Sequence, residues 1–191
     1  MYPLFMPHSR KRYLFERIVS DLKWSKTVSI LGMRQVGKTT LVKELAESYF
    51  SFDQGAVRNQ ALAEDWSFLE GAKAPIAIDE CQSVPGVFNQ VKFRVDQSNR
   101  PGQFLLTGSV RFLSKKDIRE SLTGRTSILE LLPMNLSEVH QKPLRDVFEL
   151  LSKGGSETVL KKLTAHSRFN VDQIKTFASL GGLPGICFHL L

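Results

Sequence analysis

The sequence predicts an α/β fold, in which a mostly parallel sheet of five strands is covered by helices on both faces. Two observations predict it. Five short apolar or β-branched runs recur between residues 27 and 132, and stretches with helical spacing of apolar residues separate them. Strands that alternate with helices connect by right-handed crossovers, which give a parallel sheet between two helical layers. Strand signals stop from residue 135 onward, so a short helical extension is expected after the sheet.

The individual elements follow from local patterns. Strands are expected at residues 27–31, 50–53, 74–78, 104–106 and 127–132. The run at 74–78 is apolar enough to be buried on both faces. Helices are expected at residues 38–49, 56–71 with an interruption near Asp65, 87–97, 114–122, 135–151 and 156–180, the last two separated by a break at residues 153–156. The predicted layout is a basic helical segment at 1–26, a core at 27–134 and the helical extension at 135–191.

Composition indicates a globular chain in a reducing compartment. Of the 191 residues, 42% are hydrophobic and 24% are charged, which is close to globular averages. Cys81 and Cys187 provide neither a disulfide framework nor a metal-binding spacing, so a cytoplasmic location is expected. No apolar run approaches the roughly 18 residues of a membrane helix, and residues 1–12 do not have the charge order of a signal peptide. We therefore expect no membrane association.

The net charge of +7 is distributed unevenly. Residues 1–26 and 92–125 are net positive, whereas residues 44–80 are net negative. Such basic segments are compatible with nucleic acid, anionic lipid or phosphate ligands, and equally with a solvated surface that has no partner. Charge alone therefore leaves a nucleic-acid partner open.

A phosphate-binding pattern links the first predicted strand to the next helix. Residues 32–39 read G-M-R-Q-V-G-K-T, which fits the Walker A pattern G-x-x-x-x-G-K-[ST]. Glycines allow the turn and the close approach of backbone N–H groups to an anion. Lys38 would reach the β- and γ-phosphates, and the Thr39 hydroxyl would ligate Mg²⁺. The expected nucleotide-binding residues are Gly32, Met33, Arg34, Gln35, Val36, Gly37, Lys38, Thr39 and Thr40.

Two further predicted strands end in polar side chains. Ile76-Ala77-Ile78 leads into Asp79 and Glu80, a Walker B pattern in which Asp79 would hold Mg²⁺ and Glu80 would polarise the attacking water. The strand at 104–106 leads into Thr107 and Ser109, either of which could sense the γ-phosphate or orient the water. The carboxyl ends of parallel strands share one edge of the sheet with the phosphate loop. The alternative is that the Thr107 hydroxyl satisfies backbone groups of a turn.

These motifs together resemble a large prokaryotic family of AAA-superfamily ATPases. The resemblance rests on GMRQVGKTT, AIDECQSVP, QFLLTGS and SLTGR, followed by a Leu-Leu-Pro segment, Glu138 and a Gly-Gly-Leu-Pro turn at residues 181–184. It covers roughly residues 10–185. The resemblance implies an extra strand between the Walker A and Walker B strands, ATP and Mg²⁺ as ligands, and Glu80 as the water-activating residue.

The resemblance leaves two questions open: the role of Arg125, and whether the chain is a shortened relative of the family. Arg125 occupies the family's G-R position and could be an arginine finger, a nucleotide sensor or a structural ion pair. Family members usually continue into a C-terminal domain of unknown function. This chain ends at residues 188–191 in an apolar, uncharged stretch, so we expect a truncated or shortened relative.

Several functions remain compatible with these observations. The first is a Mg²⁺-dependent ATPase that couples ATP binding and hydrolysis to a conformational change. The second is a nucleotide-binding or partner-binding module that does not hydrolyse ATP. A homo-oligomer or partner protein could complete the site in either case. A small-molecule kinase has less support, because no acceptor-site motif is recognisable. GTP also has less support, because Ser114 stands where the guanine-reading motif requires asparagine or threonine.

Overall fold

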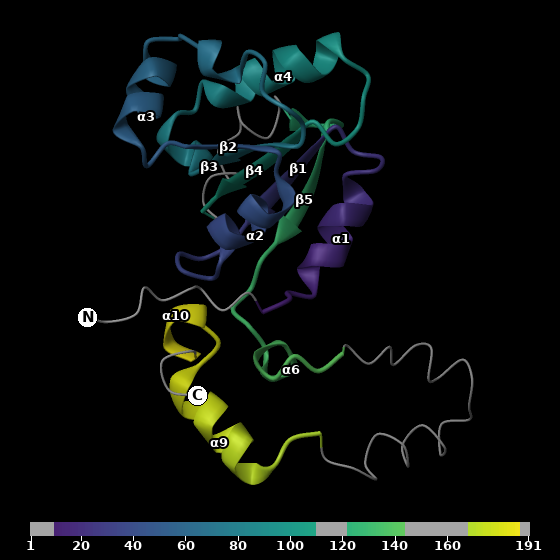
Figure 1. Cartoon of the computed structure of the whole chain (residues 1–191), viewed down its shortest axis with the longest axis vertical. Coiled ribbons are helices and arrows are strands. Elements are labelled where there is room, and N and C mark those ends of the chain that lie inside the picture. Colours follow the sequence, from purple (N-terminus) through teal and green to yellow (C-terminus); the bar gives the residue numbers. More distant parts are fainter. Residues whose placement is uncertain (1–9, 110–121, 144–167, 188–191) are drawn as a thin grey trace. The chain divides into compact units, whose positions relative to one another are not determined.

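A computed structural model describes residues 10–109, 122–143 and 168–187 of the chain (Figure 1). The chain forms two compact units. The larger unit spans Leu14–Leu132, and the smaller one combines residues 10–13 with the described part of 133–191. The two units are described separately below.

The larger unit is built on a five-stranded parallel sheet, as the sequence predicts. Its strands are β1 (Thr27–Leu31), β2 (Ser48–Ser51), β3 (Ile76–Asp79), β4 (Phe104–Gly108) and β5 (Thr126–Glu130). The order across the sheet is β2-β3-β4-β1-β5, and all four pairings are parallel. Strand β4 therefore lies between β1 and β3, which is the extra strand that the family resemblance implies.

One described helix of this unit precedes β1, and the other three follow β1, β2 and β3 along the chain. They are α1 (Leu14–Asp21), α2 (Lys38–Leu45), α3 (Gly55–Leu62) and α4 (Val87–Gln97), with two 3₁₀ turns at Ser67–Leu69 and Cys81–Ser83. Helix α4 coincides with its prediction. Helix α2 ends earlier than the predicted residue 49, because the chain from Ser48 onward is paired with β3. The predicted helix at 56–71 is divided near Asp65 into α3 and a 3₁₀ turn, as expected.

The core occupies both faces of the sheet. Alternate strand residues on one face, including Ile76, Ile78, Phe104 and Leu106, pack in one buried cluster with apolar residues of α3 and α4. The intervening residues Ala77 and Leu105 are completely buried, and α2 packs against their strands β3 and β4. Such continuous burial is typical of parallel strands that are covered on both sides.

The smaller unit contains α6 (Leu136–Val139), α9 (Val171–Leu180) and α10 (Pro184–Cys187). Helix α9 lies within the predicted helix at 156–180, and it begins where the Asn170 side chain accepts a hydrogen bond from the backbone of Gln173 in a capping box. Residues 156–167 of that prediction lie outside the described residues. Helix α6 ends at Val139, so the predicted helix at 135–151 is interrupted at residues 140–143, and residues 144–151 lie outside the described residues. The predicted helix at 114–122, apart from Leu122, and the predicted break at 153–156 lie outside the described residues.

A buried ion pair joins the N-terminal and C-terminal segments of the chain that make up the smaller unit. The Arg12 Nε lies 3.1 Å from a carboxylate oxygen of Glu138, and both side chains are buried. The same oxygen accepts a hydrogen bond from the backbone N–H of Tyr13 at 2.8 Å. Residues 10–13 therefore belong with the C-terminal helices, whereas the sequence suggested one N-terminal segment through residue 26.

Candidate functional site

The loop between β1 and α2 has the backbone that its glycine pattern predicts. Strand β1 ends immediately before the loop, and α2 begins at Lys38 (Figure 1). Gly37 has φ 99°, a left-handed conformation that glycine adopts without steric cost. Gln35 also has a left-handed backbone, with φ 66°. These turns connect the strand to the first turn of the helix, whose N-terminus favours anions.

Gly32 is required for a different reason. A Cβ at this position would come well within 3.0 Å of the Leu131 carbonyl oxygen and within 3.1 Å of the Val36 side chain. The Leu131 N–H donates a hydrogen bond to the Leu31 carbonyl at 2.7 Å, and this bond holds the backbone at Leu131 in position. The start of the loop is thus pressed against the residue that follows β5, and no side chain fits between them.

Lys38 lies beneath the loop that precedes it. Its side chain is 6% exposed, and its ammonium group donates to the carbonyl oxygens of Gly32 at 3.0 Å and Met33 at 2.8 Å. Burial lowers the pKa of Lys38, although the nearby charges of Glu80 and Asp79 oppose that shift. The cation is therefore held between the loop and the carboxylates at the end of β3. Among the other loop residues, Val36 is buried, whereas Met33, Arg34, Gln35 and Thr40 are exposed.

Asp79 is the point at which the loop, β3 and β4 meet. Its side chain is 2% exposed. The Thr39 hydroxyl donates to its Oδ2 at 2.7 Å, and the Thr107 hydroxyl donates to its Oδ1. A third donor, the Tyr49 hydroxyl of β2, lies 2.9 Å from Oδ2. The predicted proximity of Thr39, Asp79 and Thr107 is therefore present in the structure.

Glu80 follows in a left-handed conformation, with φ 60° and ψ 42°. Its backbone N–H donates to the Thr107 hydroxyl at 3.2 Å, and its carboxylate accepts a hydrogen bond from the Gln82 amide. The side-chain amide oxygen of Gln82, Oε1, in turn accepts a hydrogen bond from the Ser109 N–H at 3.3 Å. Thr107 is completely buried, and its hydroxyl connects the Asp79 carboxylate to the Glu80 backbone.

The donor set beside the loop suits Mg²⁺. It consists of one buried carboxylate and one hydroxyl, both hard oxygen donors, with Thr39 and Asp79 already in contact. Mg²⁺ is usually held by one or two carboxylates together with phosphate oxygens and water. Within the described ranges, no group of three or more histidine, cysteine, aspartate or glutamate residues forms a closed metal cage.

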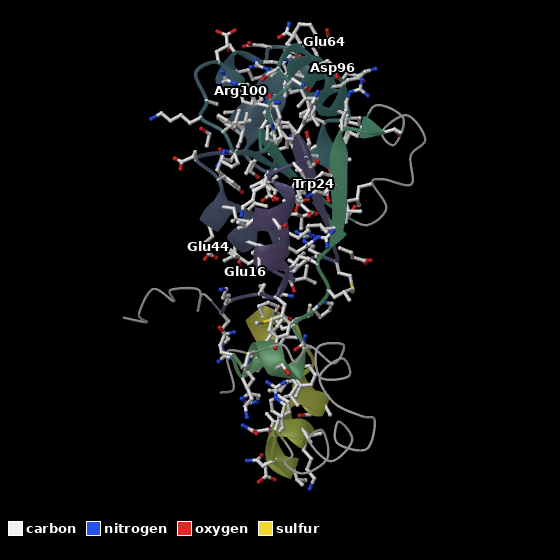
Figure 2. The ribbon with its side chains drawn as sticks, turned by 90° about the vertical axis from the view of Figure 1, so that its right-hand side faces the viewer. Glu16, Trp24, Glu44, Glu64, Asp96 and Arg100 are labelled. Carbon is white, nitrogen blue, oxygen red and sulfur yellow. The ribbon has the colours of Figure 1, made fainter. Side chains whose placement is uncertain are left out.

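Arg125 is not brought to this site. It precedes β5, and its neighbour Thr126 is in register with Thr27 at the start of β1, so it lies at the amino edge of the sheet. A strand of five residues separates the two edges by roughly 16 Å. The Arg125 guanidinium instead forms two hydrogen bonds with Asp96, at 2.7 and 3.0 Å. Figure 2 shows Asp96 at the end of this unit opposite to Glu44, which lies on α2.

Two contributors to the site were not predicted from the sequence. Tyr49 belongs to β2, and its contact with Asp79 depends on the β2–β3 pairing. Gln82 lies within the AIDECQSVP motif, and that motif alone does not predict its hydrogen bond to Glu80. A tyrosine in the strand that precedes a Walker B strand is a usable signal once parallel pairing of the two strands is assumed.

Comparisons with known proteins agree with this geometry. A family model described as an AAA domain matches residues 25–140. An uncharacterized protein of Mycobacterium bovis and one of Mycobacterium tuberculosis are each 32% identical over 126 residues, which are 64% of this chain and 29% of either relative. The chain thus corresponds to under a third of the length of these relatives.

Solved structures share the fold. A Walker-type ATPase of Pyrococcus abyssi has a TM-score of 0.50 at 15% identity, over 92% of this chain and 65% of that one. The Hsp104-ADP complex of S. cerevisiae has a TM-score of 0.52 at 15% identity, over 93% of this chain and 29% of that one.

The fold and the loop define the class as a P-loop nucleoside triphosphatase domain. Within that class, the chain belongs to the AAA domain family, whose model covers more than half of its length. None of the helices in the described ranges is long and apolar enough to cross a membrane.

Proposed function

We propose that this chain binds ATP together with Mg²⁺, hydrolyses it, and uses the cycle to drive a conformational change. The observation that supports the proposal most directly is the contact between Thr39 and Asp79, 2.7 Å apart at one edge of the sheet. This contact joins the Walker A loop to Asp79 at the end of β3. The Lys38 ammonium is bonded to the loop carbonyls and is close enough to Asp79 and Glu80 to feel their charges. A cytoplasmic location is part of the proposal and agrees with the free, buried thiol of Cys81.

The proposed roles follow from chemistry at named atoms. Backbone N–H groups of the loop and the Lys38 ammonium bind the phosphates, while Thr39 and Asp79 hold the metal. Mg²⁺ supplies positive charge that offsets the charge developing on the phosphate oxygens. Glu80 accepts a proton from water as the water oxygen attacks the γ-phosphorus. The bond between that phosphorus and the bridging oxygen then breaks, and ADP and phosphate leave.

Two substitutions test these roles. Lys38→Ala removes the cation and is expected to abolish ATP binding, measured by equilibrium binding of a fluorescent ATP analogue. Glu80→Gln keeps the size of the side chain and removes its basicity, so it should retain ATP and release no phosphate. Exposed Glu44→Gln on α2 is the matched control and should behave as wild type. Equal turnover in Glu80→Gln and wild type would refute the role of Glu80.

The position of Arg125 favours completion of the site by a second chain. Within one chain Arg125 is separated from the phosphate loop by the length of the sheet and is paired with Asp96. We therefore propose that a neighbouring copy or a partner protein supplies the arginine that accelerates hydrolysis. Turnover per chain should then rise with protein concentration. ATP binding without turnover at any concentration would instead support the non-hydrolysing, partner-binding alternative.

A further inference from the structure

Tyr49 lies on β2, the outermost strand of the sheet, and its side chain extends to Asp79 at the end of β3. In the β2–β3 pair, Tyr49 is in register with Ala77, and alternation places Asp79 on the same face two residues farther along. Ala77 is small and completely buried, which leaves room for the tyrosine ring to extend along β3. The phenol oxygen thereby lies 2.9 Å from Oδ2 of Asp79.

A cation from α2 also contacts the Tyr49 ring. The Lys43 ammonium of α2 lies 4.5 Å from the centroid of the Tyr49 ring, a cation–π distance. Burial, with the hydrogen bond to Asp79, raises the pKa of Tyr49 to about 12. The phenol O–H donates a hydrogen bond to the Asp79 carboxylate.

Three hydroxyl donors determine the orientation of the Asp79 carboxylate. Thr107 holds Oδ1, whereas Thr39 and Tyr49 both donate to Oδ2. Thr39 is itself an expected metal ligand, and Thr107 also accepts from the backbone of Glu80. Tyr49 is neither an expected metal ligand nor an acceptor for the Glu80 backbone. Its hydroxyl contributes to the site through its bond to Asp79, at the oxygen that Thr39 also contacts.

We propose that Tyr49 is a positioning residue of the magnesium site, whose hydroxyl sets the plane of the Asp79 carboxylate beside Thr39. This inference rests on the proposed function, because it requires that Asp79 and Thr39 hold Mg²⁺. Groups that orient a metal-binding carboxylate through hydrogen bonds typically change metal affinity or activity by about 10–100-fold when they are removed. Tyr49 thus acts on the metal through Asp79.

The test is Tyr49→Phe, which removes one oxygen and keeps the ring. The probe is Mn²⁺, titrated by electron paramagnetic resonance in the presence of a non-hydrolysable ATP analogue, with Mg²⁺ as competitor. The substitution should weaken metal binding about 10–100-fold and leave metal-free binding of the analogue unchanged. Tyr13→Phe is the matched control, because its phenol also donates a hydrogen bond, to the Lys142 carbonyl in the smaller unit.

A turnover measurement separates positioning from a general structural effect. With positioning, Tyr49→Phe needs more Mg²⁺ for half-maximal hydrolysis and recovers wild-type turnover at saturating Mg²⁺. Loss of turnover at every Mg²⁺ concentration overturns the inference, as does an unchanged or lower metal midpoint. If Tyr49→Phe fails to fold, Lys43→Gln keeps the phenol but frees the ring, and it should shift the metal midpoint in the same direction by less. A normal midpoint in that variant then overturns the inference.

These outcomes distinguish the two proposals. Wild-type protein that binds neither ATP nor the metal–nucleotide complex overturns the proposed function. Wild-type protein that binds both, with Tyr49→Phe indistinguishable from Tyr13→Phe, overturns the role of Tyr49 alone.

Discussion

Gly32→Ala tests whether the phosphate loop is held in place by its packing against Leu131. The new Cβ would lie well inside 3.0 Å of the Leu131 carbonyl oxygen, so one of the two backbones must retreat by more than about half an ångström. Leu131 resists because its N–H is bonded to the Leu31 carbonyl at 2.7 Å. Overpacking of this kind typically costs about 1–3 kcal/mol. In a unit of this size we expect the Tm to fall by roughly 4–12 °C.

The same displacement should disturb ligand binding. The Gly32 carbonyl accepts from the Lys38 ammonium at 3.0 Å, so moving it misplaces the cation. A misplacement worth about 1.4 kcal/mol weakens ATP binding tenfold. Differential scanning calorimetry and titration of a fluorescent ATP analogue measure the two effects. Gly55→Ala is the matched control, since a Cβ there meets nothing within 4 Å at the start of α3. If Gly32→Ala matched this control in both assays, the packing argument would be wrong.

Three further predictions concern titration and ion pairs. The raised pKa of Tyr49, about 12 against about 10 in the unfolded chain, contributes stability that is complete below pH 10 and is lost as pH rises toward 12. Urea unfolding between pH 9 and 11 should therefore show a smaller alkaline loss in Tyr49→Phe than in wild type. Glu138→Gln removes the charge that pairs with buried Arg12 and should destabilise the smaller unit by about 3 kcal/mol, seen as faster proteolysis of that unit; an unchanged rate would contradict this. Arg125→Ala breaks a partly exposed pair with Asp96 and should leave the unfolding free energy nearly unchanged. A loss of turnover confined to concentrations at which chains assemble would assign Arg125 a role in a neighbouring chain's site, whereas equal loss at every concentration would contradict it.

The strands were predictable because each is a short apolar run with a local signature. The expected bounds of all five strands differ from the observed bounds by at most two residues. The boundary between α2 and β2 was missed for a physical reason. Apolar spacing continues past Leu45, but Ser48 and its neighbours gain more from pairing with β3 than from another turn of helix. Pairing partners and strand order are properties of the whole sheet, and a local pattern does not encode them.

The site residues also divide into those that a local motif predicts and those whose contacts depend on the whole sheet. Gly32–Thr39 and Asp79 were identifiable because each motif lies in consecutive residues at the end of one strand. The contacts of Tyr49 and Gln82 were not, because they depend on register between strands and on the left-handed turn at Glu80. The edge of the sheet on which Arg125 lies becomes clear only when β5 is aligned with β1.

The close approach of Gly32 to Leu131 also has a mechanical consequence. Leu131 is two residues before Pro133, where the chain leaves the larger unit and re-enters the smaller one. With no room for a side chain between Gly32 and the Leu131 carbonyl, a loop that shifts toward β5 must push this peptide, and a loop that withdraws must release it. The path from the phosphate loop to the second unit therefore consists of one non-bonded contact, between Gly32 and Leu131, and the short stretch of backbone from Leu131 to Pro133. In the proposed ATP cycle, a movement of the loop would reach the second unit through a single carbonyl contact and two residues of backbone, without a relay of side chains.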